Sequence, residues 1–229
     1  MIKRHLLILL LCNLFISSIT IAQTTATDQG FENIINLPGW SMSNQSNPIG
    51  VTSWFQGKAN IFSAQNGGAD AYIAANFNNT GGEEGISGTI CNFLIMPDLG
   101  DVESISFFSR SVKSSNNFNV YPDRLYLVYS PTGDINTGNC SDGFGDFSET
   151  LLVINQDLTT AEEAPEGYPL ISWGRFETDV NGDGRIAFVY YVEDAGFFGT
   201  NSNHIGIDSV KWVLSFPEPQ VIFASQFEL

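Results

Sequence analysis

The chain has 229 residues, 25 of them acidic and 9 basic, so its formal net charge is −16 at pH 7. Such a charge repels phosphate backbones and anionic membranes, which argues against nucleic acid as a partner and is compatible with divalent cations. Solubility alone also accounts for it. The length is sufficient for one domain with a sizeable core.

The first 22 residues have the three parts of a secretory signal peptide. Lys3 and Arg4 give a positive start, an apolar run follows over residues 6–11, and residues 20–22 supply small side chains before the expected cut. Removing 22 of the 229 residues leaves 207, and losing two basic side chains changes the net charge from −16 to −18.

Two alternatives to a cleaved signal remain open. An uncleaved anchor would need a longer apolar run than this one, which polar residues interrupt. A lipoprotein would be modified at Cys12, but Leu11 stands where a lipidation site has a small residue.

The rest of the chain predicts strands rather than helices. Short runs rich in β-branched and aromatic residues lie between turn residues at 104–109, 124–129, 185–192 and 205–214. The run 125–129 is apolar almost throughout, which favours a strand covered on both faces. One short helix is expected at 157–166. We therefore predict an all-β, single-domain jelly-roll β-sandwich.

The segment 179–184 repeats the first half of an EF-hand loop, with Asp179, Asn181 and Asp183 at alternate positions. The twelfth position of that loop needs a bidentate acid, and here it is Tyr190, inside a predicted strand. The segment is therefore no EF-hand. Either it is a plain turn, in which Asn-Gly and Asp-Gly supply positive φ angles, or its oxygens hold calcium in a β-loop.

The chain divides into a signal peptide at 1–22, one domain at 23–215 and a tail at 216–229. Pro217 and Pro219 break any strand at the start of the tail, and the ten residues 220–229 are too few to cross a bilayer. No membrane span is expected after signal cleavage.

Cys91 and Cys140 are the cysteines that remain after cleavage. An even count in an exported chain indicates a disulfide, which would close a loop of about 50 residues and contribute roughly 4 kcal/mol. Two free thiols are the alternative.

A series of short motifs occurs in a fixed order along most of the chain. They are Phe31-Glu32, Leu37-Pro38-Gly39-Trp40, Ser53-Trp54-Phe55-Gln56-Gly57, 71–78, 88–97, 105–110, Pro122-Asp123-Arg124-Leu125, Gly167-Tyr168-Pro169 with Trp173, 184–192 and Gly206-Ile207-Asp208-Ser209-Val210. Each is weak alone, but their joint order is specific. In this the chain resembles the choice-of-anchor J domain, a group related to the cleaved adhesin domains of gingipain proteases.

The resemblance implies a jelly-roll sandwich on an exported protein of a Gram-negative bacterium, secreted, in the periplasm or at the cell surface. Most members have no defined activity, and the gingipain relatives are adhesins with structural calcium. Two departures stand out. The Pro217–Pro219 motif lacks the apolar span and arginines of a sorting anchor, and the Asp-rich segment of gingipain modules is missing after Trp40.

For calcium the resemblance favours Glu32 and Asp208, because the first and last strands of a jelly roll lie side by side and an acid from each can share one cation. Asp70, just before a strand, is a third candidate. The alternative is that these are ordinary strand-end acids hydrogen-bonded to backbone.

No catalytic motif stands out. His204 is the only histidine left after signal cleavage, and we expect it on the surface rather than as the base of a nucleophile. No zinc motif or phosphate-binding glycine loop occurs. A glycoside hydrolase would need two carboxylates across a cleft, and nothing indicates such a pair.

The tryptophans offer another possibility, stacking on sugar rings. Trp40, Trp54 and Trp173 coincide with family motifs, which favours core packing, and the face of Trp212 is open. Trp212 and Trp54 are therefore weak ligand-binding candidates. Asparagine-rich loops at 76–79 and 116–119 carry phenylalanines and suit recognition or plain turns.

We therefore expect a non-catalytic binding or adhesion module, stabilised by calcium, whose partner is an extracellular protein or a glycan. A carbohydrate-binding module is the first alternative, and a carboxylate-based glycoside hydrolase is the second.

Overall fold

The computed structural model describes residues 26–113, 120–164 and 166–215. The predicted signal peptide, the tail at 216–229 and the loop at 116–119 lie outside the described residues. Within them, no helix is long and apolar enough to span a bilayer. The described elements are one short 3-10 turn, η1 (Phe77–Asn79), and the strands β1 (Ala26–Gln29), β2 (Ser41–Asn44), β3 (Phe55–Gln56), β4 (Ile73–Asn76), β5 (Gly88–Ile95), β6 (Val102–Ser111), β7 (Leu125–Ser130), β8 (Glu149–Ile154), β9 (Gly174–Gly182), β10 (Arg185–Ala195) and β11 (His204–Leu214).

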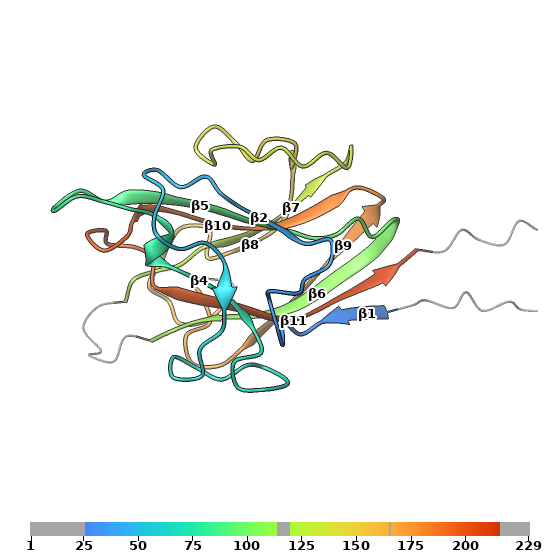
Figure 1. Cartoon of the computed structure of the whole chain (residues 1–229), viewed down its shortest axis with the longest axis horizontal. Coiled ribbons are helices and arrows are strands. Elements are labelled where there is room, and N and C mark those ends of the chain that lie inside the picture. Colours follow the sequence, from blue (N-terminus) through green and yellow to red (C-terminus); the bar gives the residue numbers. More distant parts are fainter. Residues whose placement is uncertain (1–25, 114–119, 165, 216–229) are drawn as a thin grey trace, which may run out of the picture.

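The strands form two antiparallel sheets that pack face to face (Figure 1). One has the order β2-β5-β10-β7-β8. The other has the order β3-β4-β11-β6-β9, and β1 continues the edge of β11 beyond β4. The predicted all-β, single-domain sandwich is confirmed, while the jelly-roll topology stays a prediction. The four strands predicted from the sequence correspond to β6, β7, β10 and β11.

The predicted helix at 157–166 is wrong, because the described residues of this segment form turns, bends and irregular backbone. The Asn155 side chain accepts a hydrogen bond from the Thr159 backbone N–H at 2.8 Å and donates to the Thr159 carbonyl at 3.0 Å. Leu158 between them has a φ of 49°. The Thr159 carbonyl thus bonds a side chain instead of a later backbone N–H, and the positive φ of Leu158 is not helical.

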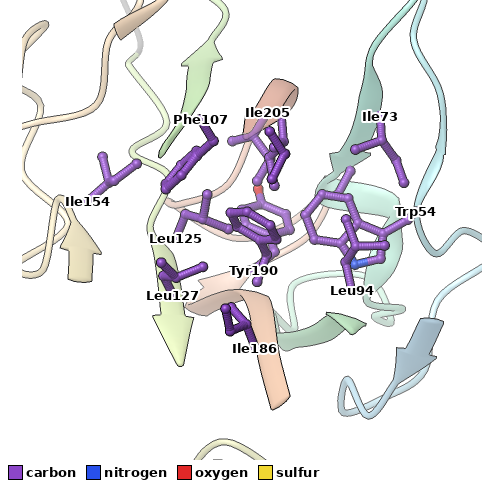
Figure 2. Packing of buried hydrophobic residues seen from close by; sticks show 14 of the residues in the cluster. Trp54, Ile73, Leu94, Phe107, Leu125, Leu127, Ile154, Ile186, Tyr190 and Ile205 are labelled. Atoms are coloured by element: carbon purple, nitrogen blue, oxygen red, sulfur yellow. The ribbon is translucent and has the colours of Figure 1, made fainter. Parts of the chain in front are cut away.

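The main core lies between the sheets. Alternate residues of each strand point inward, so Ile186 and Tyr190 of β10 belong to one core cluster with Phe107 of β6 and Ile205 of β11 (Figure 2). The intervening residues point outward and are also apolar. The outward Ala187 and Val189 follow this pattern, as does the predicted two-sided burial of β7.

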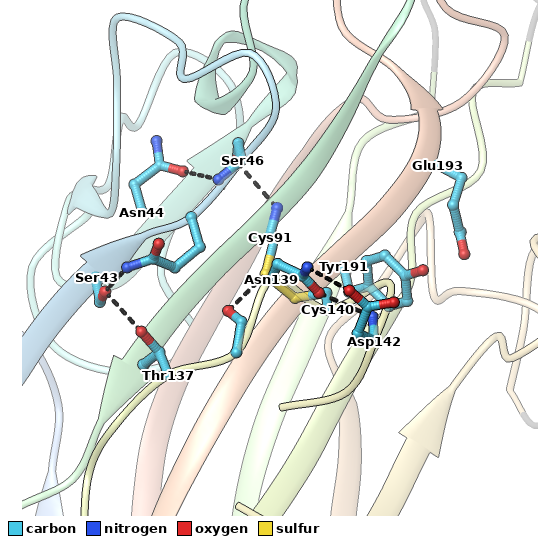
Figure 3. Close-up of a disulfide and its surroundings, with 12 residues drawn as sticks. Ser43, Asn44, Ser46, Cys91, Thr137, Asn139, Cys140, Asp142, Tyr191 and Glu193 are labelled. Atoms are coloured by element: carbon cyan, nitrogen blue, oxygen red, sulfur yellow. Dashed lines mark hydrogen bonds between the residues drawn. A yellow bond between two sulfur atoms is a disulfide. The ribbon is translucent and has the colours of Figure 1, made fainter. Parts of the chain in front are cut away.

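The outer face of the five-stranded sheet is covered by residues 131–148, the yellow segment above the sheet in Figure 1. Phe147 of this segment packs against Phe93 of β5. A disulfide joins Cys140 to Cys91 of β5, with 5.8 Å between the two Cα atoms (Figure 3). The covalent bond therefore holds the cover on the sheet.

The outer face of the six-stranded sheet is covered only in part, by residues 57–71. Phe62 of this segment stacks on Tyr72 at a centroid distance of 4.9 Å and meets the edge of Trp173 at 5.5 Å. His204 packs between Phe62 and Phe55 and is 6% exposed, so the expected surface position is wrong. Burial lowers the pKa of His204 to about 4, and the charge of Lys58 adds to this shift.

Asp123 brings a carboxylate into the interior beside the main core. It accepts hydrogen bonds from the Ser111 hydroxyl, the Tyr190 hydroxyl and, at 2.8 Å, the Asn203 backbone N–H. Burial nevertheless raises the pKa of Asp123 to about 6, because the three hydrogen bonds only partly offset the loss of water around the charge. The Pro122-Asp123-Arg124 motif therefore carries a buried polar network.

The raised pKa of Asp123 predicts that stability depends on pH, and Asp123→Asn should remove this dependence. Between pH 4 and 6 the folded state binds a proton at Asp123 that the unfolded state, with a pKa near 4, does not bind. Stability from the neutral carboxyl is thus present at low pH and lost as the pH rises through about 6. Lowering the pH from 7 to 5 should stabilise the parent relative to Asp123→Asn by about 1 kcal/mol, measured by urea unfolding.

The asparagine is a suitable control, because its oxygen accepts from Tyr190 and Asn203 and its amide donates to Ser111. His204 and Asp208 titrate in both proteins and cancel in the comparison. Parallel stability curves for the two proteins between pH 5 and 7 would contradict the prediction.

Candidate ligand-binding groove

A groove of about 640 Å³ lies on the part of the six-stranded sheet that residues 57–71 leave open. Its floor comes from β1, β11, β6 and β9, and its walls are the segment after β1 and the tip of the 57–71 loop. The lining residues are Asp28, Gln29, Gly30, Glu32, Gln65, Asn66, Ser106, Phe108, Arg175, Ser209 and Lys211. Figure 1 shows β1, β11 and β6 side by side in the lower layer, above the teal 57–71 loop.

A β-bulge in β11 sets which side chains reach this groove. Asp208 pairs with Phe108 and Lys211 pairs with Ser106, so three steps along β11 match two along β6. The bulge residue Ser209 has a φ of 49°. In a regular strand Asp208 and Lys211 would point to opposite faces, but the bulge places both on the outer face.

Asp208 ties the loop to the sheet. Its side chain is fully buried, and its Oδ2 accepts hydrogen bonds from the backbone N–H groups of Gln65 at 2.8 Å and Asn66 at 3.1 Å. Its Oδ1 accepts from the Ser209 N–H at 2.6 Å. Burial raises the pKa of Asp208 to about 6, the three hydrogen bonds oppose the shift, and the negative charge of Glu32 adds to it.

Glu32 reaches the same place from the other end of the chain. It follows β1, is exposed, and its carboxylate lies beside the backbone of Gly30 and Gly67, where a Cβ on Gly67 would be 3.4 Å from Oε1. Glu32 and Asp208 thus lie close enough for their negative charges to interact. Asp70 lies elsewhere on the loop, where its carboxylate accepts from the Ala59 N–H.

Among the described residues, no three histidines, cysteines or acids gather closely enough to hold a metal ion by themselves. Asp179 lies in β9 opposite Ser104, and the chain then crosses from one sheet to the other at 183–184. At the crossing, the Gly184 N–H donates to the Tyr129 hydroxyl at 2.9 Å. A Cβ on Gly182 or Gly184 would overlap Tyr129, which explains the glycines.

The tryptophan candidates lie away from the groove. Trp54 is 5% exposed within the main core, and Trp212 is partly buried and packs against that core. Trp40 packs edge-on against Phe31, and Trp173 donates its indole N–H to the Ser63 carbonyl at 3.0 Å. The face of Trp212, which the sequence left open, is the inner one.

No local pattern in the sequence marks the groove's basic residues. Lys211 forms no ion pair with any described residue, and Asp28 lies directly opposite it on β1. Arg175 of β9 lies opposite Phe108 and pairs with the exposed Glu177 at 2.7 Å. Asp208 and Lys211 are three positions apart, which predicts opposite faces in a regular strand. Only the bulge places them on the same face.

No protein-family model matches the sequence, and no curated protein matches it. Solved structures are similar in fold. The K1 cleaved adhesin domain of Lys-gingipain from Porphyromonas gingivalis W83 has a TM-score of 0.54 at 19% identity, covering 84% of this chain and 99% of that one. The K3 domain from the same strain has a TM-score of 0.52 at 12% identity, covering 84% and 100%. The K2 domain has a TM-score of 0.51 at 15% identity, covering 82% and 99%.

At such low identities the likeness shows a common fold and leaves the ligand open. The relation to cleaved adhesin domains that the motifs indicate agrees with this fold, whereas the name choice-of-anchor J rests on the motifs alone.

The crossing at 183–184 yields a prediction that separates a turn from a metal loop. Gly184→Ala should lower the free energy of unfolding by about 1–3 kcal/mol, because the methyl group has no room beside Tyr129. Asp183→Asn should have the same stability as the parent, both in EDTA and in calcium. Thermal and urea unfolding measure both. A calcium response that disappears in Asp183→Asn would show that the segment is a metal loop.

Proposed function

We propose that the protein is a non-catalytic, exported binding module of the adhesin type, which takes an extracellular protein or glycan into the groove on its six-stranded sheet. The observation that carries this proposal is the open, polar groove on the outer face of the six-stranded sheet. Lys211 and Arg175 face it beside carboxylates, amides and Phe108. Such a mixture of fixed polar groups on rigid strands suits recognition of a polar ligand.

The position of Asp208 supports a binding role rather than hydrolysis. A glycoside hydrolase needs carboxylates that reach the scissile bond. The Asp208 carboxylate is instead covered by the loop and accepts three backbone N–H bonds, so its oxygens face the protein. This geometry fits a residue that positions the groove wall.

Export and location are part of the proposal. The signal-like residues 1–22 and the Cys91–Cys140 disulfide both fit a chain that matures in an oxidising compartment. We place the protein outside the cytoplasm of a Gram-negative bacterium, in the periplasm, at the cell surface or in the medium.

Calcium is the proposed stabilising ion, held by Glu32 and Asp208. The donor chemistry fits in kind, because the negative charges of Glu32 and Asp208 repel each other and the amide side chains of Gln65 and Asn66 line the same groove. Asp208 already accepts three hydrogen bonds, so Glu32 and backbone carbonyls would supply most ligands. Bound calcium would neutralise the repulsion and link the segment after β1 to the loop and to β11.

Calcium should therefore raise the thermal stability of the mature protein. At 100 times its dissociation constant it would add about 2.7 kcal/mol, a shift of several degrees over EDTA. Glu32→Gln should abolish the shift while the exposed position still folds, and Asp183→Asn should retain it. No shift in the parent, or an equal shift with magnesium and in Glu32→Gln, would contradict the calcium proposal.

Ligand binding through the groove is tested separately. The parent should bind at least one component of an array of extracellular proteins and glycans. Lys211→Glu should weaken the binding of at least one such component by about tenfold or more, since it reverses an unpaired charge in the groove. Lys113→Glu, also an exposed lysine but outside the groove, is the matched control. An equal effect of both variants would contradict binding through the groove.

A further inference from the structure

Two phenylalanines project from the loop between β10 and β11. The side chain of Phe197 is 79% exposed and that of Phe198 is 42% exposed, and their rings meet edge to face with centroids 5.1 Å apart. The exposed Val51 lines the same shallow cavity as both rings. Adjacent exposed aromatic rings on a soluble protein mark an interaction site, because burying them is favourable.

Hydrogen bonds hold the loop that carries these rings. The Asp194 carboxylate accepts a hydrogen bond from the Thr200 hydroxyl, and the Asp194 carbonyl accepts one from the Asn201 N–H at 3.0 Å. The Gly196 N–H donates to the Ser202 hydroxyl at 3.0 Å. Because the loop is already ordered, a ligand that covers the rings loses little conformational entropy on binding.

A small cavity of about 190 Å³ lies beside Phe197. Its lining combines aromatic rings with polar groups and consists of Phe77, Tyr121, Gly196, Phe197, Ser202 and Asn203. Pockets for drug-sized ligands have volumes of about 300–1,000 Å³. This cavity is smaller, so it fits one small unit of a larger ligand. An apolar ring face beside hydroxyl and amide groups matches a sugar, which has an apolar face and a rim of hydroxyls.

The charge around the cavity further limits the kind of ligand that can bind. No lysine or arginine is among the described residues that line this cavity or the neighbouring one of about 170 Å³. The whole chain has a net charge of −16. Acidic sugars and anionic membranes are therefore repelled, whereas a neutral sugar is not.

We propose that the β10–β11 loop binds a neutral hexose unit of a glycan, with Phe197 against the apolar face of the sugar ring and Ser202 and Asn203 at its hydroxyls. This site shares no lining residue with the groove, so the proposal does not depend on ligand binding in the groove.

The test uses the mature protein and neutral gluco-, manno- and galacto-oligosaccharides as probes, with affinity measured by titration calorimetry. At least one probe should bind. Phe197→Ala should weaken it by about tenfold, and Phe197→Trp, which keeps an aromatic face, should retain it. Ile171→Ala removes an equally apolar, 66% exposed side chain from another loop and should have no effect. Lys211→Glu should have none either, which separates this site from the groove.

Three results would overturn the proposal. The first is that no neutral oligosaccharide binds. The second is that binding survives both Phe197→Ala and Phe198→Ala while the thermal unfolding of the variants matches that of the parent. The third is that the parent, but not Phe197→Ala, sediments with vesicles of zwitterionic phosphatidylcholine, since the loop would then bind a lipid surface.

Discussion

Both sheets carry apolar residues on both faces, and this constraint governs the rest of the structure. Packing the sheets together covers one face of each, so the outer faces need covers of their own. On the five-stranded sheet, outward residues such as Phe93 and Val189 lie under the segment 131–148, which the disulfide holds in place. On the six-stranded sheet the cover 57–71 reaches only part of the face. Where it stops, the outward residues are polar except for Phe108, and the groove forms there.

One buried carboxylate marks the boundary between the covered and the open part. Asp208 accepts the backbone N–H groups of Gln65 and Asn66 and so fixes the groove wall. Burying a charge is costly, and three hydrogen bonds do not fully offset the cost, as the raised pKa of Asp208 shows. The negative charge of Glu32 raises the cost of burying this charge further. The residue that shapes the groove is therefore also the place where a proton or a cation would stabilise the protein.

Local patterns predicted β6, β7, β10 and β11, because alternation and turn residues act over a few positions, and the two-sided burial of β7 followed from its continuous apolar run. The helix prediction failed because the Asn155 side chain bonds the Thr159 carbonyl and Leu158 has a positive φ angle. The groove was invisible for another reason. A one-residue bulge changes which side chains share a face, so only the structure shows that Asp208 and Lys211 both lie on the outer face. Likewise, nothing local indicated that His204 and Asp123 are buried.

Asp208 holds the loop tip as a rigid wall of the binding groove, and amide hydrogen exchange at Gln65 and Asn66, followed by NMR, tests this role most directly. Both residues are exposed, yet their N–H groups donate to a buried carboxylate. The structure predicts that these two amides exchange about as slowly as those of the sheet, and more slowly still with calcium if the ion binds there. Exchange at the rate of an open loop, with or without calcium, would contradict this role of Asp208.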